Sequence, residues 1–522
     1  MNRLAIINVV GLTESLIGEH TPRILEFVKR GALANISPAF PAVTCTAQSN
    51  YLTGKNPAQH GIVGNGWFNR ELSEIHFWKQ SNHLVQSPKL WDALRAQSEI
   101  GNHKSSIANL FWWFNMFSSV DFSITPRPIY KADGGKVFDI YSWPYSIREE
   151  IKRDLGEFPF FGFWGPAAGI KTPQGFADCA TRWIAESARW IEKKFSPTLN
   201  LIYLPHLDYN LQRFGTYVGS TGVSPVVSGV APETVLTATP AFGENANPQS
   251  LSSNEIRRDA EFNRRDACAT HPKIIPDLRA IDSIVGDLID FFRSREVGII
   301  LLSEYGITNV NTPIHLNRIF REHGWLAIKD ELGLEILDAG ASKVFAVADH
   351  QIAHIYLNDA SLEKSVRELL EKTSGVEKIL GKTEKIAAGI EHSRSGDLIA
   401  VAKENAWFTY YYWLDDARAP DFARTIDIHR KPGYDPAELF LDPKIAFPKL
   451  KIARRLLQKK LGFRMLMDVI PLDATLVKGS HGRVPTNKKD WPVIIAGQPE
   501  FLPAKEIQST DVFQFLLRHF DS

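Results

Sequence analysis

Polar side chains follow three apolar runs of the sequence, at the points where buried strands would end. The three segments are Val10-Gly11-Leu12-Thr13, Pro205-His206-Leu207-Asp208 and Ser303-Glu304-Tyr305-Gly306. In open α/β sheets ligands bind beyond the carboxyl ends of the strands, so a sheet would bring Asp208 and Glu304 to one edge. Glu304 is then placed to act as a general base. For any one of these residues alone, a solvated or helix-capping group is the simpler interpretation.

Thr44 adds a hydroxyl group to this set. The run Pro41-Ala42-Val43-Thr44 places Thr44 where a helix can begin, and Leu52-Thr53-Gly54 would end that helix. Unpaired N–H groups and the positive dipole end at a helix N-terminus suit a phosphate and a developing alkoxide. The sequence therefore indicates Thr44 as a nucleophile, and an ordinary N-cap is the alternative.

Strand and helix patterns alternate around these residues. Leu4–Val10, Thr198–Leu204 and Gly298–Leu302 are apolar runs typical of strands buried on both faces. One helical pattern begins at Thr21-Pro22, and another covers Pro276–Phe292. This alternation predicts an α/β fold with a mainly parallel central sheet and helices on both faces.

Length and charge exclude several classes of protein. The chain has 522 residues, 60 Lys and Arg against 59 Asp and Glu, and only three cysteines. A net charge of +1 argues against nucleic-acid binding. Three scattered cysteines argue against a disulfide framework, and no apolar run is long enough to span a membrane. We expect a cytoplasmic protein without a membrane span, and the sequence does not indicate its oligomeric state.

Two long segments depart from the alternating pattern. Residues 216–271 are rich in Ser, Thr, Pro, Asn and Gly and predict a disordered or low-complexity insertion. Residues 309–475 mix short strands with aromatic clusters and predict an inserted, cap-like α+β lobe. The core domain is then 1–308 together with 476–522.

The lobe contains a polar turn that could bind an anion. Asp427–Asp435 includes His429 and Lys431, and Arg424 is nearby. Arg and Lys neutralise phosphates, so these three side chains are candidate substrate-binding residues. The alternative, which we favour, is a solvated loop.

Aromatic residues are concentrated at Phe111–Phe114 and Trp407–Trp413. Such residues most often form a core. If they line the cleft, the substrate has a large apolar or ring-shaped part.

Four segments together resemble the nucleotide pyrophosphatase/phosphodiesterase branch of the alkaline phosphatase superfamily. The first runs from Thr21 to Trp67 and contains Phe40-Pro41-Ala42-Val43-Thr44, Leu52-Thr53-Gly54 and His60-Gly61-Ile62-Val63-Gly64-Asn65. The others are Asp208 followed by Gly215, Leu302-Ser303-Glu304-Tyr305-Gly306 and Gly479-Ser480-His481-Gly482. The resemblance implies a two-metal site, usually zinc, a Thr or Ser nucleophile at Thr44, and contact of Asn65 with the transferring phosphoryl group.

The departures from the family pattern fall on the metal ligands. The first strand ends in Val10 where the family has Asp, Gln212 stands in place of His, and Glu304-Tyr305 replaces an Asp-His pair. Asp349-His350 could be a displaced Asp-His pair, but its place in the lobe argues against this. The resemblance therefore implies a degenerate active site.

The remaining ligands predict a single metal site. Asp208, His481 and Gln212 would form it, and His206 would join them if it lies on an extended segment, where alternate residues share a face. The alternative for His206 is a hydrogen-bonded histidine beside a proline bend. The expected cofactor is one divalent ion, zinc by resemblance, or none.

These observations favour a hydrolase of a phosphate ester or diester acting on a phosphorylated small molecule. Two alternatives stay open. One is a non-catalytic or binding descendant of the fold. The other is a transferase or isomerase of a phosphorylated or prenylated small molecule.

Overall fold

A computed structural model describes residues 3–100, 105–132, 136–168, 180–217, 270–502 and 504–520. Their main feature is a nine-stranded sheet, parallel at its centre, which confirms the predicted α/β class. In spatial order its strands are β23 (Glu506–Gln508), β2 (Ala32–Ser37), β22 (Val493–Ala496), β11 (Gly298–Leu302), β1 (Leu4–Val9), β10 (Leu199–Leu204), β5 (Ile107–Leu110), β6 (Phe122–Pro126) and β9 (Ile140–Trp143).

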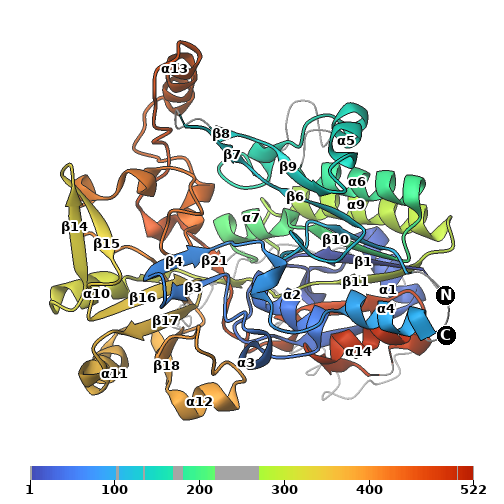
Figure 1. Cartoon of the computed structure of the whole chain (residues 1–522), viewed down its shortest axis with the longest axis horizontal. Helices are drawn as coiled ribbons and strands as arrows, with labels where there is room; N and C mark the ends of the chain where they lie inside the picture. Colours follow the sequence, from blue (N-terminus) through green and yellow to red (C-terminus); the bar gives the residue numbers. More distant parts are fainter. Residues whose placement is uncertain are drawn as a thin grey trace, which may run out of the picture.

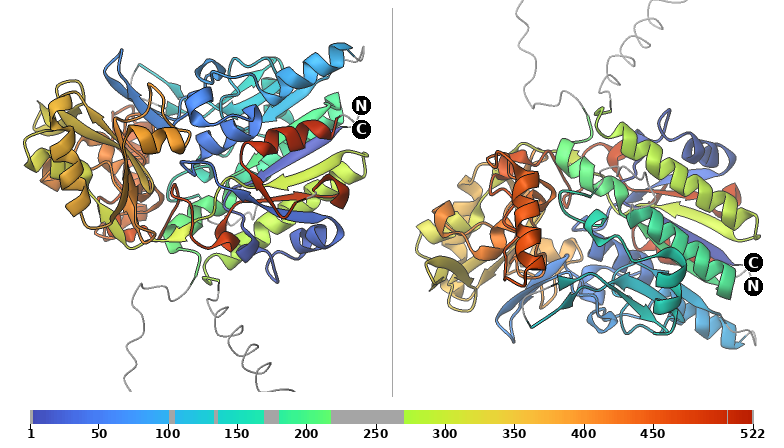
Figure 2. Two further views of the ribbon diagram at one scale, coloured as in Figure 1. Left: turned by 90° about the horizontal axis from the view of Figure 1, so that it is seen from below. Right: turned by 90° about the horizontal axis from the view of Figure 1, so that it is seen from above.

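Helices cover both faces of this sheet (Figures 1 and 2). One face carries α1 (Pro22–Arg30), α5 (Ile147–Leu155), α6 (Ala180–Phe195), α7 (His206–Phe214) and α9 (Ile275–Arg293). The other carries α2 (Thr44–Thr53), α4 (Leu90–Ile100) and α14 (Asp511–Arg518). The central strands are apolar on both sides because both faces are covered, as the sequence predicted.

The register of the three central strands aligns their carboxyl ends. β1 lies between β10 and β11, with Val9 opposite Leu204 and Asn8 opposite Leu302. Glu304 therefore follows β11 at the same edge at which α7, the helix of Asp208, follows β10. This shared edge positions the candidate site.

A second, antiparallel sheet forms the centre of the lobe. Its order is β16 (Val344–Asp349), β17 (Ile352–Leu357), β19 (Leu398–Ala402) and β18 (Val376–Leu380). The helices of this region are α10 (Leu316–Glu322), α11 (Glu363–Lys372), α12 (Lys382–Ala387) and α13 (Pro448–Lys460). Trp407 and Tyr410–Trp413 are buried in its apolar core, so this cluster is structural. The limits of the lobe at 309 and 475 stay a prediction.

In the described part of the chain, five short strand pairs lie outside the two larger sheets. They are β3 (Gly66–Asn69) with β4 (Glu74–Phe77), β7 (Ile129–Tyr130) with β8 (Lys136–Val137), β12 (Thr308–Asn309) with β21 (Gly479–Ser480), β13 (Thr312–Ile314) with β20 (Ala406–Phe408), and β14 (Ala327–Glu331) with β15 (Leu334–Asp338). One further helix is α3 (Pro57–His60). The predicted insertion lies almost wholly outside the described residues; at its ends, Tyr217 and Thr270 form an antiparallel bridge.

The polar turn of the lobe is fixed by a buried ion cluster. The Lys431 ammonium lies 2.7 Å from both the Asp435 and Glu438 carboxylates, and its side chain is only 1% exposed. The two carboxylates raise the pKa of Lys431, although burial acts in the opposite direction. Lys431 is therefore unavailable to a ligand, and the prediction that it binds substrate is wrong because its charge is already neutralised inside the lobe.

Replacement of Lys431 tests this cluster. We expect Lys431→Ala to lower the free energy of unfolding by about 3–5 kcal/mol, since it leaves two carboxylates buried without a cation. The adjacent Arg430 forms a 3.1 Å pair with Asp421 at the surface, so Arg430→Ala should cost below about 1 kcal/mol. Urea denaturation of both variants measures the difference, and equal losses would contradict the assignment.

Candidate active site

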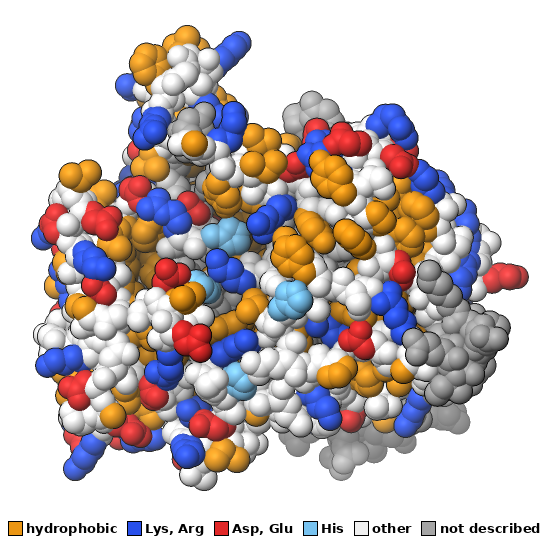
Figure 3. Space-filling view, in the orientation of Figure 1, with side chains coloured by type: hydrophobic (Ala, Val, Ile, Leu, Met, Phe, Trp, Pro, Cys, Tyr) orange, Lys and Arg blue, Asp and Glu red, His pale blue; other side chains and the backbone are white. Residues whose placement is uncertain are grey.

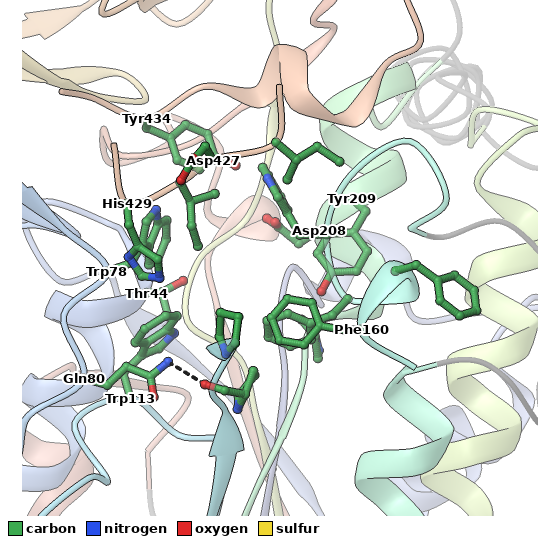
Figure 4. A pocket seen from close by; sticks show the side chains of 18 of the residues that line it. Thr44, Trp78, Gln80, Trp113, Phe160, Asp208, Tyr209, Asp427, His429 and Tyr434 are labelled. Carbon is green, nitrogen blue, oxygen red and sulfur yellow. Dashed lines mark hydrogen bonds between the residues drawn. The ribbon is translucent and has the colours of Figure 1, made fainter. Parts of the chain in front are cut away.

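A cavity of about 300 Å³ lies beyond the carboxyl ends of β10 and β11, between the central sheet and the lobe. Thr44, Asp208, Tyr305 and His350 contribute to its polar end. In Figure 4, Trp78 and Trp113 lie on one side of Asp208, and Phe160 and Tyr209 lie on the other. The remaining wall is mostly apolar, with Pro126, Pro128, Tyr130, Phe138, Phe161, Phe163, Trp164, Ile426 and Ile428.

Thr44 is the first residue of α2, as predicted. Val43 before it has extended backbone, and Gly54 ends the helix with a φ of 66°, in the left-handed region that favours glycine. The Thr44 hydroxyl lies 3.2 Å from the hydroxyl of Tyr305. It is buried at the polar end of the cavity, with α2 directed away from it.

Asp208 lies in the first turn of α7, and each of its two carboxyl oxygens accepts a hydrogen bond. Tyr305 donates to its Oδ1 at 3.2 Å, and the Gln212 amide donates to its Oδ2 at 2.8 Å. Burial raises the pKa of Asp208 to about 7, although both hydrogen bonds act to lower it. Asp208 can therefore gain or lose a proton near neutral pH.

Glu304 is a second buried carboxyl group. Its Oε1 accepts hydrogen bonds from the amides of Asn8 and Gln48, each at 2.5 Å. Burial raises the pKa of Glu304 to about 8, and the nearby Asp208 carboxylate adds to this effect. Glu304 is thus mostly protonated at neutral pH, which makes it a poor general base there.

Four aromatic rings form a continuous stack beside Asp208. The centroids of Tyr305 and His481 are 3.6 Å apart, those of His481 and His350 are 3.7 Å apart, and those of His350 and Tyr434 are 3.5 Å apart. Tyr305 and His481 come from the core, whereas His350 and Tyr434 come from the lobe. The stack therefore joins the two parts of the chain at the site.

Hydrogen bonds close this stack into a ring. Tyr434 donates to the side-chain Oε1 of Gln212 at 2.8 Å, and the Gln212 Nε2 in turn donates to Asp208. Asp208 is thereby linked to both outer rings of the stack, to Tyr305 directly and to Tyr434 through Gln212. The Asp208 and Gln212 side chains thus connect the two ends of the stack.

The two histidines are neutral and directed by their neighbours. His481 Nδ1 lies 2.8 Å from the carbonyl oxygen of Ala42, and His350 Nδ1 lies 2.8 Å from the Asp349 carboxylate. Burial lowers the pKa of both imidazoles well below the ordinary range. Within the described part of the chain, both Nε2 atoms are buried without a hydrogen-bond partner. They are the free acceptors of the site.

Asn65 is held by neighbouring groups. Its side-chain oxygen accepts from the backbone N–H of Cys45 at 3.0 Å, and its amide nitrogen donates to Asp349 at 3.1 Å. In this arrangement Asn65 positions the start of α2. Its predicted contact with a phosphoryl group stays a prediction.

His206 lies elsewhere, and the expectation that it shares a face with Asp208 is wrong. That expectation required an extended backbone, but His206 is the first residue of α7, where residues two apart point in different directions. Its Nε2 contacts the Asp277 carboxylate at 3.0 Å. The alternative interpretation, a hydrogen-bonded histidine after a proline, describes the structure.

Of the three predicted substrate-binding residues Arg424, His429 and Lys431, only His429 lines the cavity. Arg424 forms a 3.7 Å ion pair with Asp442 and is absent from the cavity wall. The sequence interpretation argued against Asp349-His350 as a displaced metal-binding pair because it belongs to the lobe. The structure nevertheless brings His350 to the site: the two-residue turn between β16 and β17 carries it against His481, and the Asp349-His350 pair was the signal that could have located it.

The donors do not fit the metal site that the resemblance implies. Both Asp208 oxygens accept hydrogen bonds, and Gln212 presents its amide N–H groups, rather than its oxygen, to Asp208. Val10 has no donor, and Tyr305 occupies the place of an imidazole. No group of three or more His, Cys, Asp and Glu residues among those described is arranged to hold a metal ion. The expected ligand set of Asp208, His481 and His206 or Gln212 is not assembled.

Comparison with known proteins identifies the fold. The model of the type I phosphodiesterase/nucleotide pyrophosphatase family matches residues 4–435. Murine ectonucleotide pyrophosphatase/phosphodiesterase 5, solved as an inactive form in complex with AMP, is similar with a TM-score of 0.53 and 13% identity, over 100% of this chain and 95% of that chain. Phosphonoacetate hydrolase from Sinorhizobium meliloti, in complex with phosphonoformate, is similar with a TM-score of 0.54 and 12% identity, over 99% and 95%. No curated protein matches the sequence.

The raised pKa of Asp208 predicts a pH-dependent stability. The folded carboxyl titrates at about 7, against 3.8 for the ordinary group, so the folded state keeps a proton that the unfolded chain has lost. The contribution of Asp208 to the free energy of unfolding is therefore largest at low pH. It falls as the pH rises toward 7, by up to about 4 kcal/mol. We expect the isosteric variant Asp208→Asn to lose less stability between pH 5 and pH 7 than the wild-type chain.

Thermal unfolding at several pH values measures this effect. The exposed Asp511→Asn serves as the matched control and should follow the wild-type curve. Parallel curves for all three proteins would contradict the titration of Asp208 in this range.

Proposed function

Because the chain belongs to the type I phosphodiesterase/nucleotide pyrophosphatase family, we propose that it hydrolyses a phosphate ester, with Thr44 as nucleophile. The observation that carries the proposal is the hydrogen-bonded row of Thr44, Tyr305 and Asp208 at the polar end of the cavity. This row offers a route for the threonine proton that uses only side chains of the chain itself.

Each step of the proposed reaction follows this row. The Thr44 oxygen bonds to phosphorus while the bond from phosphorus to the leaving alcohol breaks. The hydroxyl proton of Thr44 passes to Tyr305, and the phenol proton passes to Asp208. A carboxylate with a pKa of about 7 is well matched to this task at neutral pH. The leaving alkoxide takes a proton from water. A second water then attacks the phosphothreonine diester, the bond from phosphorus to the Thr44 oxygen breaks, and the proton held on Asp208 returns through Tyr305 to that oxygen, so that a phosphomonoester is released and the Thr44 hydroxyl is restored.

The charge of the cavity favours a singly charged substrate. No Lys or Arg occurs among the described residues that line it, and two of them, Asp208 and Asp427, are acidic. A phosphomonoester dianion would meet no full positive charge there, whereas a phosphodiester carries one negative charge that the N-terminus of α2 partly offsets. We therefore propose a diester with one apolar or ring-shaped group, which the aromatic walls would bury.

The same charge pattern supports a second candidate. Stabilisation of developing charge is usually the largest contribution to phosphoryl transfer, and the cavity provides little of it. A binding descendant of the fold, which holds an apolar ligand without cleaving it, is consistent with this. Turnover and binding are therefore measured separately.

Replacement of Thr44 distinguishes the two candidates. We expect protein pretreated with a chelator to hydrolyse bis(para-nitrophenyl) phosphate faster than para-nitrophenyl phosphate. Thr44→Ala should lower that rate by about 100-fold or more, because it removes the nucleophile, and Thr44→Ser should retain most of it. Equal rates for Thr44→Ala and wild type would refute the nucleophile.

Displacement of the fluorophore anilinonaphthalene sulfonate from the cavity by the diester gives the binding readout. Displacement that is the same in wild type and Thr44→Ala, with no turnover in either, would establish the binding candidate.

The proton route predicts the form of the pH–rate profile. The wild-type rate should rise with pH through about 7, since Asp208 must be ionised to accept the proton. Tyr305→Phe keeps the ring stacked on His481 but removes the hydroxyl, so we expect a rate lowered at least about tenfold and no inflection near pH 7. An unchanged inflection in Tyr305→Phe would exclude the relay through Tyr305.

A further inference from the structure

Helix α13 projects from the body of the protein, at the same edge as the β7–β8 pair (Figure 1). None of its residues is buried. Leu450 and Leu457 on the helix, and Leu461 directly after it, are 68%, 56% and 65% exposed. A solvent-facing helix normally presents polar side chains outward, so this exposure requires an explanation.

The three leucines form one stripe on the outer side of the helix. They are spaced by seven and then four residues, which places them on a single helical face. On another face, Lys451 and Arg455 each lie 2.9 Å from Asp468, in the segment that returns to the lobe. The helix therefore directs its apolar stripe away from the protein and uses charged side chains to attach itself.

The segment that bears this stripe is strongly cationic. Residues 443–467 contain eight Lys and Arg and no Asp or Glu. The cations are Lys444, Lys449, Lys451, Arg454, Arg455, Lys459, Lys460 and Arg464. Figure 3 shows basic and apolar side chains mixed on this projection. An apolar stripe with flanking cations is the pattern of helices that lie in the interface of an anionic membrane.

The projection begins and ends near the mouth of the cavity. The backbone N–H of Asp442 donates to Val469, and that of Ile470 donates to Arg424, two residues before Ile426 of the cavity wall. Ile426, Tyr130 and Phe138 line the cavity and are 39%, 54% and 51% exposed. A surface that contacts α13 would therefore also lie close to this apolar rim.

We propose that α13 docks the protein on the surface of an anionic lipid bilayer, with its leucine stripe among the acyl chains and its cations against the headgroups. The attachment is peripheral, since no helix among the described residues is long and apolar enough to cross a membrane. Docking would hold the cavity rim at the lipid surface, where an amphiphilic diester can enter. The docking itself does not depend on the proposed hydrolysis.

Sedimentation with vesicles tests the proposal without reference to activity. The full chain is mixed with phosphatidylcholine vesicles, with or without phosphatidylglycerol. We expect binding to the anionic vesicles only, and weaker binding as salt increases. The triple variant Leu450→Ser, Leu457→Ser, Leu461→Ser should bind at least about tenfold more weakly, because it removes the inserted side chains.

Two further variants complete the test. The variant Lys449→Gln, Lys459→Gln, Lys460→Gln should also bind about tenfold or more weakly, and its binding should depend less steeply on salt because three of the eight cations are removed. The matched control Leu72→Ser, Leu332→Ser, Leu414→Ser replaces leucines that are 60%, 104% and 52% exposed elsewhere, and should bind as wild type.

Failure of the wild-type chain to sediment with anionic vesicles would overturn the proposal, as would equal binding by the stripe variant. A second outcome would also overturn it: the wild-type chain is a dimer, the stripe variant is a monomer, and neither binds vesicles. The stripe would then contact a second copy of the chain.

Discussion

Burial of the Asp208 carboxyl group is the constraint on which the site depends. A carboxylate removed from water is stable only with a counter-ion or with several hydrogen-bond donors. Here the donors are Tyr305 and Gln212, and each is itself fixed by a further contact. The stacked rings and the start of α2 lie around this pair of donors: His481 stacks on Tyr305, Thr44 contacts the Tyr305 hydroxyl, and Tyr434 contacts Gln212.

The ring stack occupies the place where the family resemblance implies metal coordination. A metal would fix its ligands by short, strong bonds, whereas this chain fixes Tyr305, His481, His350 and Tyr434 by stacking and by four hydrogen-bonded contacts at their edges. This difference affects the charge of the site as well as its geometry. The described lining of the cavity contains no Lys or Arg, so apolar surface and hydrogen bonds must supply most of the binding energy and a high negative charge on the ligand is disfavoured.

Sequence patterns predicted the parts of this structure that local rules determine. The apolar runs at Leu4, Thr198 and Gly298 became the central strands, and Thr44 begins a helix that Gly54 ends. The backbone after Pro205 was not predictable in this way, because a helix starts at once where an extended segment was equally compatible with the sequence. The contacts of His350 and Lys431 depend on residues from distant elements or on the folding of a turn, and no local pattern encodes them.

The junction of lobe and core also determines how a ligand enters. The turn between β16 and β17 is joined to the core by a backbone hydrogen bond from Gln351 to His481, as well as by the ring stack. A rigid-body rotation of the lobe would break both contacts at once. A path into the cavity that leaves these contacts intact runs past the half-exposed rings of Tyr130 and Phe138 at the rim. Exposed side chains change rotamer within picoseconds to nanoseconds, so such a path would not require a slow movement of the lobe.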